Sequence, residues 1–198
     1  MDTSEEAQII KITTADLSFK IELNINWGAQ SPNHRIQIRE HLFEEEEAEH
    51  FSSINKFNLY NLQMLPQAQD GYFSISHCQK IGGYAFAKGE VGFDIEEKIR
   101  VSEPIIIRTS TADEIKMAPQ KKFLWVAKEA AFKALSAAAL EMQKTLVMTQ
   151  IHCHQWKMIS LNSSFWSFEV QLADSLELKK NKGFVFEKNE LLFGVFFR

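Results

Sequence analysis

The stretch GEVGFDIEEKIR, residues 89–100, decides how the middle of the chain folds. Phe93 and Ile95 are apolar, and they alternate with the carboxylates Asp94 and Glu96. Because successive side chains of a strand point to opposite faces, we expect a strand here with one buried, apolar face. Asp94 and Glu96 then lie two residues apart on the other face, where their negative charges repel each other. Another part of the chain must offset this repulsion.

Strand-like and helix-like segments occur twice in the same order along the chain. The helix-like segments are 33–51, which follows a Ser-Pro-Asn cap, and 119–142, whose apolar residues have helical spacing. The pattern of residues 102–118 favours neither a helix nor a strand. We interpret residues 187–190 as the turn of the last hairpin. The strand-like segments are 9–27, 72–78, 82–89, 91–96, 146–160, 165–173, 183–187 and 191–198.

This order predicts an α+β protein with two similar halves, an N-terminal half over residues 1–89 and a C-terminal half over residues 90–198. A chain of 198 residues suits one domain or two small ones, and 45% of hydrophobic residues suffices for a packed core. We find no convincing sequence repeat, so the expected similarity is one of architecture.

The composition and net charge of the chain argue against several classes of protein. The net charge of −4 disfavours broad nucleic-acid binding, which needs a basic face. No apolar run reaches the roughly 18 residues that span a bilayer, and the acidic N-terminus lacks the pattern of a signal peptide. Two cysteines, Cys78 and Cys153, are too few for a disulfide framework. We therefore expect a cytoplasmic protein.

A second informative stretch is LWVAKEAAFKAL, residues 124–135. On a helix, Glu129 and Lys133 share one face, and alone they would be an ordinary surface pair. With Asp94 and Glu96, Glu129 makes a set of three carboxylates that suits Mg²⁺, a cation that takes oxygen ligands and shares them with phosphates. Such a cation would offset the repulsion in the opening stretch, and Lys133 would suit a phosphate bridged by the metal.

The third stretch is FSISHC, residues 73–78, in which Ser76 and His77 stand at the end of a strand before a turn. Hydroxyls, an imidazole and the N–H groups of a turn can bind phosphate oxygens. A structural histidine is the alternative interpretation. The neighbouring pattern His152-Cys153-His154 lacks a further ligand pair with zinc spacing, so we do not interpret it as a metal site.

These three stretches, in this order, resemble the motifs of the 4′-phosphopantetheinyl transferase family. FSISHC is similar to its Ser-His motif, and VGFDIE is similar to its Gly-(Val/Ile)-Asp-(Ile/Val)-Glu motif. WVAKEAAFKA matches its Trp-x-x-Lys-Glu-(Ala/Ser)-x-x-Lys motif at every fixed position. The matching core covers residues 73–135, about a third of the chain. The chain length and the two-half plan resemble the pseudo-dimeric, surfactin-synthetase-activating type.

The resemblance implies a fold and a reaction. The fold would be two similar α+β subdomains related by a pseudo-twofold, with coenzyme A bound in the active-site cleft between them. The reaction would attach the 4′-phosphopantetheine arm of coenzyme A to a serine of an apo acyl or peptidyl carrier protein and release 3′,5′-ADP. Such carriers serve fatty-acid or secondary-metabolite biosynthesis, and we expect a monomer.

The resemblance also implies roles for single residues. The Mg²⁺ ligands would be Asp94, Glu96 and Glu129. Lys133 would contact the phosphates, where it adds a second cation to the metal. We expect Glu129 to take the proton of the attacking serine hydroxyl, which makes Glu129 and Lys133 the catalytic candidates. The residues expected to bind coenzyme A are Ser76, His77, Lys133, Arg35 and Arg39, with His77 and the two arginines as candidates for the 3′-phosphate.

Three features depart from the family pattern. Phe93 stands where the family has Val or Ile, although it is still apolar. QMLPQAQDG stands where the family often has a Gly-Lys-Pro segment, so that only Lys56 is left as a substitute for one phosphate-binding lysine. The segment between Glu96 and Trp125, which in the family helps to receive the carrier protein, is short here.

Other functions stay open beside this one. A non-catalytic coenzyme A-binding protein of the same fold would have less need of three carboxylates. A Mg²⁺-dependent phosphohydrolase or nuclease could use the same acids, although the acidic balance weighs against a nuclease. Because carrier proteins are usually acidic, we expect a local basic or apolar docking patch, and a solvated helix start is the alternative. The patch candidates are Lys116, Lys121, Lys122, Met117 and Phe123.

Overall fold

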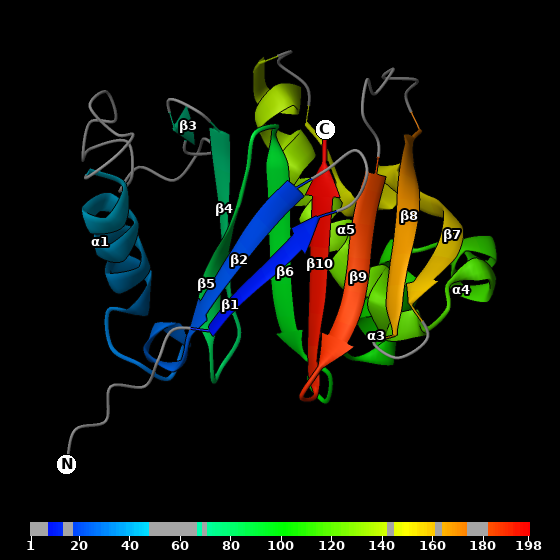
Figure 1. The fold of residues 1–198 in the computed structure, drawn as a ribbon. Coiled ribbons are helices and arrows are strands. Elements are labelled where there is room, and N and C mark those ends of the chain that lie inside the picture. Colours follow the sequence, from blue (N-terminus) through cyan, green and yellow to red (C-terminus); the bar gives the residue numbers. More distant parts are fainter. Residues whose placement is uncertain are drawn as a thin grey trace. The chain divides into compact units, whose positions relative to one another are not determined.

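The computed structural model describes residues 8–13, 18–47, 67–68, 71–141, 145–160, 164–173 and 182–198 (Figure 1). It is a mixed α+β structure with two antiparallel five-stranded sheets, which confirms the predicted fold class. The chain divides into two compact units, Met1–Glu90 and Val91–Arg198, called unit 1 and unit 2 below. None of the helices in the described residues is both long enough and apolar enough to cross a membrane.

Unit 1 is built on the sheet of order β1-β2-β5-β4-β3. Its core contains Trp27, Ile38, Leu42, Phe73 and Tyr84, which α1, the sheet and the short helix η1 contribute together. The strands that we expected from the isoleucine-rich segment and from FSISHC are confirmed, and so is the helix that follows the Ser-Pro-Asn cap. The elements are β1 (Gln8–Thr13), β2 (Ser18–Asn24), η1 (Ile25–Trp27), α1 (His34–Glu47), β3 (Gln67–Ala68), β4 (Gly71–His77) and β5 (Gly82–Ala87).

Unit 2 is built on the sheet of order β6-β10-β9-β8-β7. Residues 102–118, for which the sequence favoured neither state, form two short helices, and a capping box between Thr111 and Glu114 starts the second of them. The elements are β6 (Val91–Glu97), α3 (Glu103–Thr109), α4 (Ala112–Met117), α5 (Lys121–Glu141), η2 (Met148–Gln150), β7 (Ile151–Ser160), β8 (Phe165–Leu172), β9 (Lys182–Lys188) and β10 (Leu191–Phe197).

The predicted final hairpin joins β9 and β10. Lys188 pairs with Leu191, which leaves Asn189 and Glu190 as a two-residue turn. Both turn residues have a positive φ, 53° and 62°, as a type I′ turn requires. The backbone twist of this turn matches the twist of the strands, so β10 returns along β9 and then pairs with β6.

The helix α5 lies directly on the backbone of β6 and β10 (Figure 1). Two glycines allow this close approach: a Cβ atom on Gly92 would clash with the carbonyl oxygen of Ala130, and one on Gly194 with that of Val126. Gly194 pairs with Asp94 across the two strands. Side chains of α5 beside this contact line are therefore within reach of the acidic face of β6.

The two units share a chain plan. In unit 1 the strand β2 precedes α1, and the antiparallel strands β3, β4 and β5 follow it, with β5 pairing back onto β2. In unit 2 the strand β6 precedes the helices, and the antiparallel strands β7 to β10 follow them, with β10 pairing back onto β6. Unit 1 adds β1 at the outer edge of β2. The predicted similarity of architecture thus extends to strand order.

Candidate active site

The strand β6 has Asp94 and Glu96 on one face, as the alternation predicted, and α5 packs on that face. Phe93 and Ile95, on the other face of the strand, are completely buried. Asp94 is only 4% exposed, and it lies on the same face as Gly92, over which α5 packs. Glu96 follows on that face and is partly exposed. Asp94 is therefore covered, whereas Glu96 is open to solvent at one side.

Lys133 of α5 reaches across to Asp94. Its Nζ lies 2.8 Å from Oδ1 of Asp94 and also donates a hydrogen bond of 2.9 Å to the carbonyl oxygen of Phe93. The side chain of Lys133 keeps 28% of its surface exposed, whereas that of Asp94 keeps 5%. The strand motif VGFDIE and the helix motif WVAKEAAFKA therefore meet within unit 2. Helical and strand periodicity had placed these residues on faces but could not show that the faces meet.

Glu129 and Glu96 belong to the same electrostatic cluster. Burial, together with the negative charge of Asp94, raises the pKa of Glu129 to about 7, although Lys133 acts in the opposite direction. Burial, Asp94 and Glu129 raise the pKa of Glu96 to about 7 as well, against the opposing effects of Lys133 and Arg100. The three carboxylates are close enough to repel one another, and Lys133 offsets only part of that repulsion.

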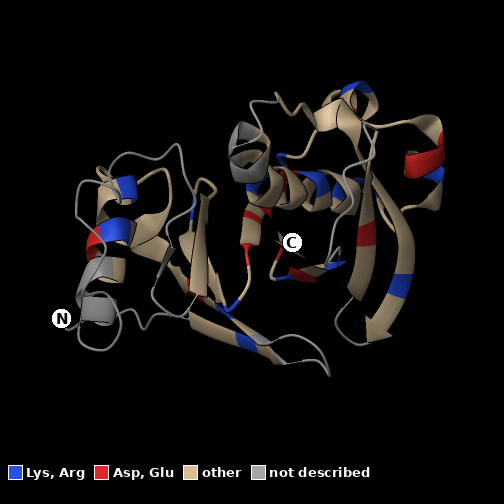
Figure 2. Cartoon of the chain, turned by 90° about the horizontal axis from the view of Figure 1, so that it is seen from above, with Lys and Arg blue, Asp and Glu red and all other residues tan. Residues whose placement is uncertain are grey.

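Carboxylates that are close together and short of positive charge have the donor chemistry that a hard cation takes. In the described part of the chain, no group of three or more His, Cys, Asp or Glu side chains could hold a metal ion as the side chains stand. The cation at Asp94 is instead the ammonium group of Lys133. Figure 2 shows basic residues along α5, and the helix also carries the acid Glu129.

A second polar cluster lies in unit 1, where β4 ends beside the start of α1. Nε of Arg35 donates a hydrogen bond of 3.1 Å to Nε2 of His77. This bond requires an unprotonated Nε2, which leaves Nδ1 to carry the proton of a neutral ring. Ser76 and Arg39 are both buried. The structure thus brings Arg35 and His77 together, and Arg39 and Ser76 lie on the same two elements, α1 and β4.

His34 belongs to this cluster, although the sequence analysis did not single it out. Its ring meets that of His77 edge to face, with 4.4 Å between the ring centroids. Nδ1 of His34 is 3.1 Å from the carbonyl oxygen of Ser31, and Nε2 is buried without a hydrogen-bond partner. The only signal in the sequence was its place beside Arg35, at the start of the predicted helix.

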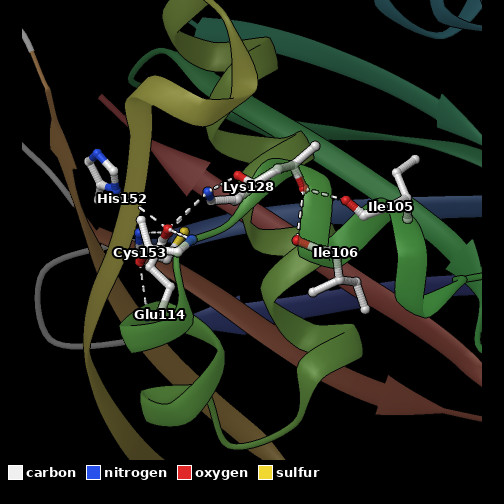
Figure 3. Close-up of polar contacts among 8 residues, drawn as sticks. Ile105, Ile106, Glu114, Lys128, His152 and Cys153 are labelled. Atoms are coloured by element: carbon white, nitrogen blue, oxygen red, sulfur yellow. Dashed lines mark hydrogen bonds and ion pairs between the residues drawn. The ribbon is translucent and has the colours of Figure 1, made fainter.

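The surroundings of His152 and Cys153 give these residues structural contacts (Figure 3). Nδ1 of His152 is 3.4 Å from Oε2 of Glu114, and the backbone N–H of Cys153 donates to Oε1 of the same residue at 3.0 Å. Complete burial raises the pKa of the Cys153 thiol far above its ordinary value, so the thiol is unreactive.

The expected docking patch needs one correction. Phe123 is completely buried in the core of unit 2, so its assignment to the surface was wrong; the helical period of α5 turns it toward the sheet. Met117 is 54% exposed, and Ile107, which we had not considered, is 61% exposed. Lys121 forms an ion pair with Glu103.

The other two lysines of the patch, Lys122 and Lys116, have different surroundings. Lys122 donates to the carbonyl oxygen of Lys98 at 2.5 Å, which draws its side chain toward the end of β6. Lys116, in the last turn of α4, is exposed. Lys56, the substitute phosphate-binding lysine, lies outside the described residues.

Comparison with models of protein families finds no match, and no curated protein matches the chain. Any functional inference must therefore start from the motifs and from the two clusters described above.

Proposed function

We propose that this protein is a Mg²⁺-dependent 4′-phosphopantetheinyl transferase, which moves the phosphopantetheine arm of coenzyme A to a serine of an apo acyl or peptidyl carrier protein. The observation that carries this proposal is the contact of Lys133 with Asp94. It joins the acidic strand motif to the lysine-bearing helix motif, with Glu96 and Glu129 in the same electrostatic cluster. A random pair of surface motifs would have no reason to converge in this way.

Asp94, Glu96 and Glu129 would hold the Mg²⁺ ion in this proposal. When bound, the ion supplies positive charge to the diphosphate of coenzyme A, where negative charge develops on the leaving group. Lys133 stands at the carboxylates on a flexible stem that is partly exposed, so its ammonium can also contact a phosphate oxygen.

Glu129 is the proposed proton acceptor for the serine hydroxyl. A general base works best when its pKa is close to the working pH, and the pKa of Glu129 is raised to about 7. Burial is the largest cause of this rise, and the charge of Asp94 is the second. Both causes follow from the packing of α5 on β6.

The cluster of unit 1 would bind the 3′-phosphate of coenzyme A. Arg35 supplies a guanidinium group, which suits phosphate oxygens, and His77 supplies a second donor through the Nδ1–H of its ring. Ser76 and Arg39 lie on the same two elements and are secondary candidates.

The shared chain plan of the units supports the finer fold assignment, in which two α+β subdomains are related by a pseudo-twofold and coenzyme A binds between them. A chain with such an internal pseudo-symmetry would be a monomer, and we place it in the cytoplasm. Carrier proteins would dock on the exposed apolar residues Ile107 and Met117, beside the basic Lys116.

Mass spectrometry of a carrier protein tests the proposal directly. The carrier is incubated with coenzyme A, Mg²⁺ and the protein, and we expect one phosphopantetheine group to appear on its serine. A carrier with Ser→Ala at that position and a reaction with a chelator serve as controls. Coenzyme A binding without transfer would indicate a non-catalytic binder, and hydrolysis of coenzyme A in the absence of a carrier would indicate a phosphohydrolase.

A further inference from the structure

A buried ion pair joins α5 to the short helices that precede it (Figure 3). Lys128 is completely buried, and its Nζ lies 3.0 Å from Oε1 of Glu114. Nζ also donates a hydrogen bond of 2.5 Å to the carbonyl oxygen of Thr109, the last residue of α3. The hydroxyl of Thr109 in turn bonds to the carbonyl oxygen of Ile105 at 2.8 Å. Lys128 therefore ties α5 to the last turn of α3 and to the first turn of α4.

Glu114 connects the same point to the sheet. Oε2 accepts a hydrogen bond of 2.9 Å from the backbone N–H of Thr111, and Oε1 accepts one of 3.0 Å from that of Cys153 in β7. Burial acts to raise the pKa of Glu114, but these N–H donors and Lys128 outweigh it, so the pKa stays below its ordinary value. One charged carboxylate thus holds α4, α5 and β7 together.

Stability alone does not account for this arrangement. Removing two charges from water is costly, and well-packed apolar residues often replace a buried ion pair with no loss of stability. What apolar residues do not supply is a fixed direction, because their contacts are non-directional. The hydrogen bonds of Lys128, by contrast, specify where its ammonium group must stand.

The position of Lys128 on α5 explains why a fixed orientation of this helix matters. Gly92 and Gly194 bring α5 close to the sheet, and the apolar face of the helix packs in the core of unit 2 through contacts that are non-directional. Lys128 directly precedes Glu129 in the chain, so a helix held at Lys128 also holds Glu129 in place. Any rotation of α5 that moved Glu129 away from Asp94 would pull Lys128 out of its bonds with Glu114 and Thr109.

We infer that Glu114 and Lys128 are positioning residues, which fix the rotation of α5 so that Glu129 faces Asp94 at the proposed metal site. This inference rests on the proposed function, because it assigns the residues their role through Glu129. Neither residue is among the proposed ligands of the metal or of coenzyme A.

The double variant Glu114→Gln/Lys128→Met tests this role, because it removes both charges and leaves no unpaired charge buried. Supporting contacts behind metal ligands typically contribute about 10- to 100-fold to affinity or activity. We expect kcat of transfer to fall, and the Kd for Mn²⁺ in calorimetry to rise, by about that factor. KM for coenzyme A should change less than kcat, because Arg35 and His77, the proposed donors to the 3′-phosphate, belong to unit 1.

The matched control is Lys98→Met/Glu187→Gln. This change removes another ion pair of unit 2, with 2.7 Å between its charged atoms, that does not hold α5. It should leave kcat and Mn²⁺ affinity at the wild-type values. Glu114→Asp is the second variant: it keeps a charge for Lys128 but shortens the reach, so it should lose activity in the same direction if the double variant does not fold.

The outcomes separate the two hypotheses. If the wild-type protein transfers the arm and the folded Glu114 and Lys128 variants match it in kcat and Mn²⁺ affinity, the positioning role is wrong while the proposed function stands. If the wild type binds Mn²⁺ but does not transfer, the proposed function is wrong, and Mn²⁺ affinity alone decides the positioning role. A wild-type protein that neither transfers the arm nor binds Mn²⁺ would overturn both.

Discussion

The two units each carry a buried acid on the strand that precedes the covering helix, but the surroundings of the two acids differ. Glu22 of β2 receives three partners: Tyr84 donates at 2.8 Å, His41 of α1 lies at 2.8 Å, and Lys20 at 2.7 Å. Burial acts to raise the pKa of Glu22, but its partners outweigh burial and lower the pKa to about 2. In unit 1, therefore, one acid is held by several partners of suitable charge.

Unit 2 has the opposite balance. Three carboxylates share the surroundings of one lysine, and the pKa values of Glu96 and Glu129 are raised to about 7. Repulsion between carboxylates that no partner offsets does not stabilise a fold. Acids with strongly shifted pKa values are therefore found mostly at functional sites. The comparison separates an acid that stabilises its unit from the acids that we propose bind a metal ion.

The largest effect should come from Glu129→Gln. The change keeps the shape of the side chain but removes the charge proposed to hold the metal and to accept the proton. We expect the rate of transfer to fall by about 10²- to 10⁴-fold, and the thermal stability of the metal-free protein to stay equal or rise slightly, because repulsion with Asp94 is lost. Transfer assays and thermal melts measure the two effects.

Glu103→Gln is the control for this change, since Glu103 is an exposed acid that pairs with Lys121 and is not a proposed metal ligand. Near-normal transfer by Glu129→Gln at saturating Mg²⁺ would remove both roles from Glu129. A large loss of stability in the metal-free variant would instead show that Glu129 stabilises the fold, as Glu22 does in unit 1.

His77→Ala tests whether the other unit also has a functional polar cluster. A hydrogen bond to a charged group contributes about 1.5–3 kcal/mol, so coenzyme A should bind about 10- to 150-fold more weakly. Dephospho-coenzyme A, which lacks the 3′-phosphate, should lose much less. Calorimetry with both ligands measures the difference, and equal losses would contradict the contact of His77 with the 3′-phosphate.

Glu22→Gln should behave as a stability change. Tyr84, His41 and Lys20 would lose a charged acceptor in a mostly buried place, which should lower the free energy of unfolding by about 1–3 kcal/mol. The rate of transfer per folded molecule should stay close to wild type. Urea denaturation measures the first quantity, and a loss of transfer without a loss of stability would show that the two units do not differ as proposed.

The smallest effects concern pH, and they should have opposite signs in the two units. The pKa of Glu22 is lower in the folded state than in the unfolded chain, so its contribution is present above about pH 4.5 and lost as the pH falls toward 2. The pKa of Glu96 and of Glu129 is higher in the folded state, so the folded protein binds more protons between about pH 4.5 and 7. The stability of the metal-free site should therefore fall as the pH rises through 7.

Each of these contributions is on the order of 1 kcal/mol once solvent screening is allowed for. Urea denaturation of the wild type and of Glu96→Gln at about pH 5 and pH 8 isolates the site, because groups that do not interact with Glu96 cancel in the difference. Added Mg²⁺ should reduce this pH dependence. A stability difference between wild type and Glu96→Gln that rises with pH would contradict the cluster of repelling acids.

The sequence was sufficient for features that depend on local periodicity. The period of two in the opening stretch predicted that Asp94 and Glu96 share a face, and the structure confirms it, because a strand leaves its side chains no other choice. Helical spacing likewise predicted α5, and the last hairpin was visible from its turn residues. These features depend only on residues that are close together in the sequence.

Tertiary structure decided everything that depends on partners far apart in the chain. Lys133 and Asp94 are separated by 39 residues, and Glu114 and Cys153 by 39 residues as well, so no local pattern could pair them. The same holds for Phe123, which we had expected at the surface, and for His34, which is significant only because His77 lies beside it. The sequence by itself determined which faces the strands and helices present, because backbone geometry repeats at short range. Which faces meet follows only from the packing of α5 on Gly92 and Gly194 of the sheet. This packing decides which acids repel one another and that Lys133 pairs with Asp94.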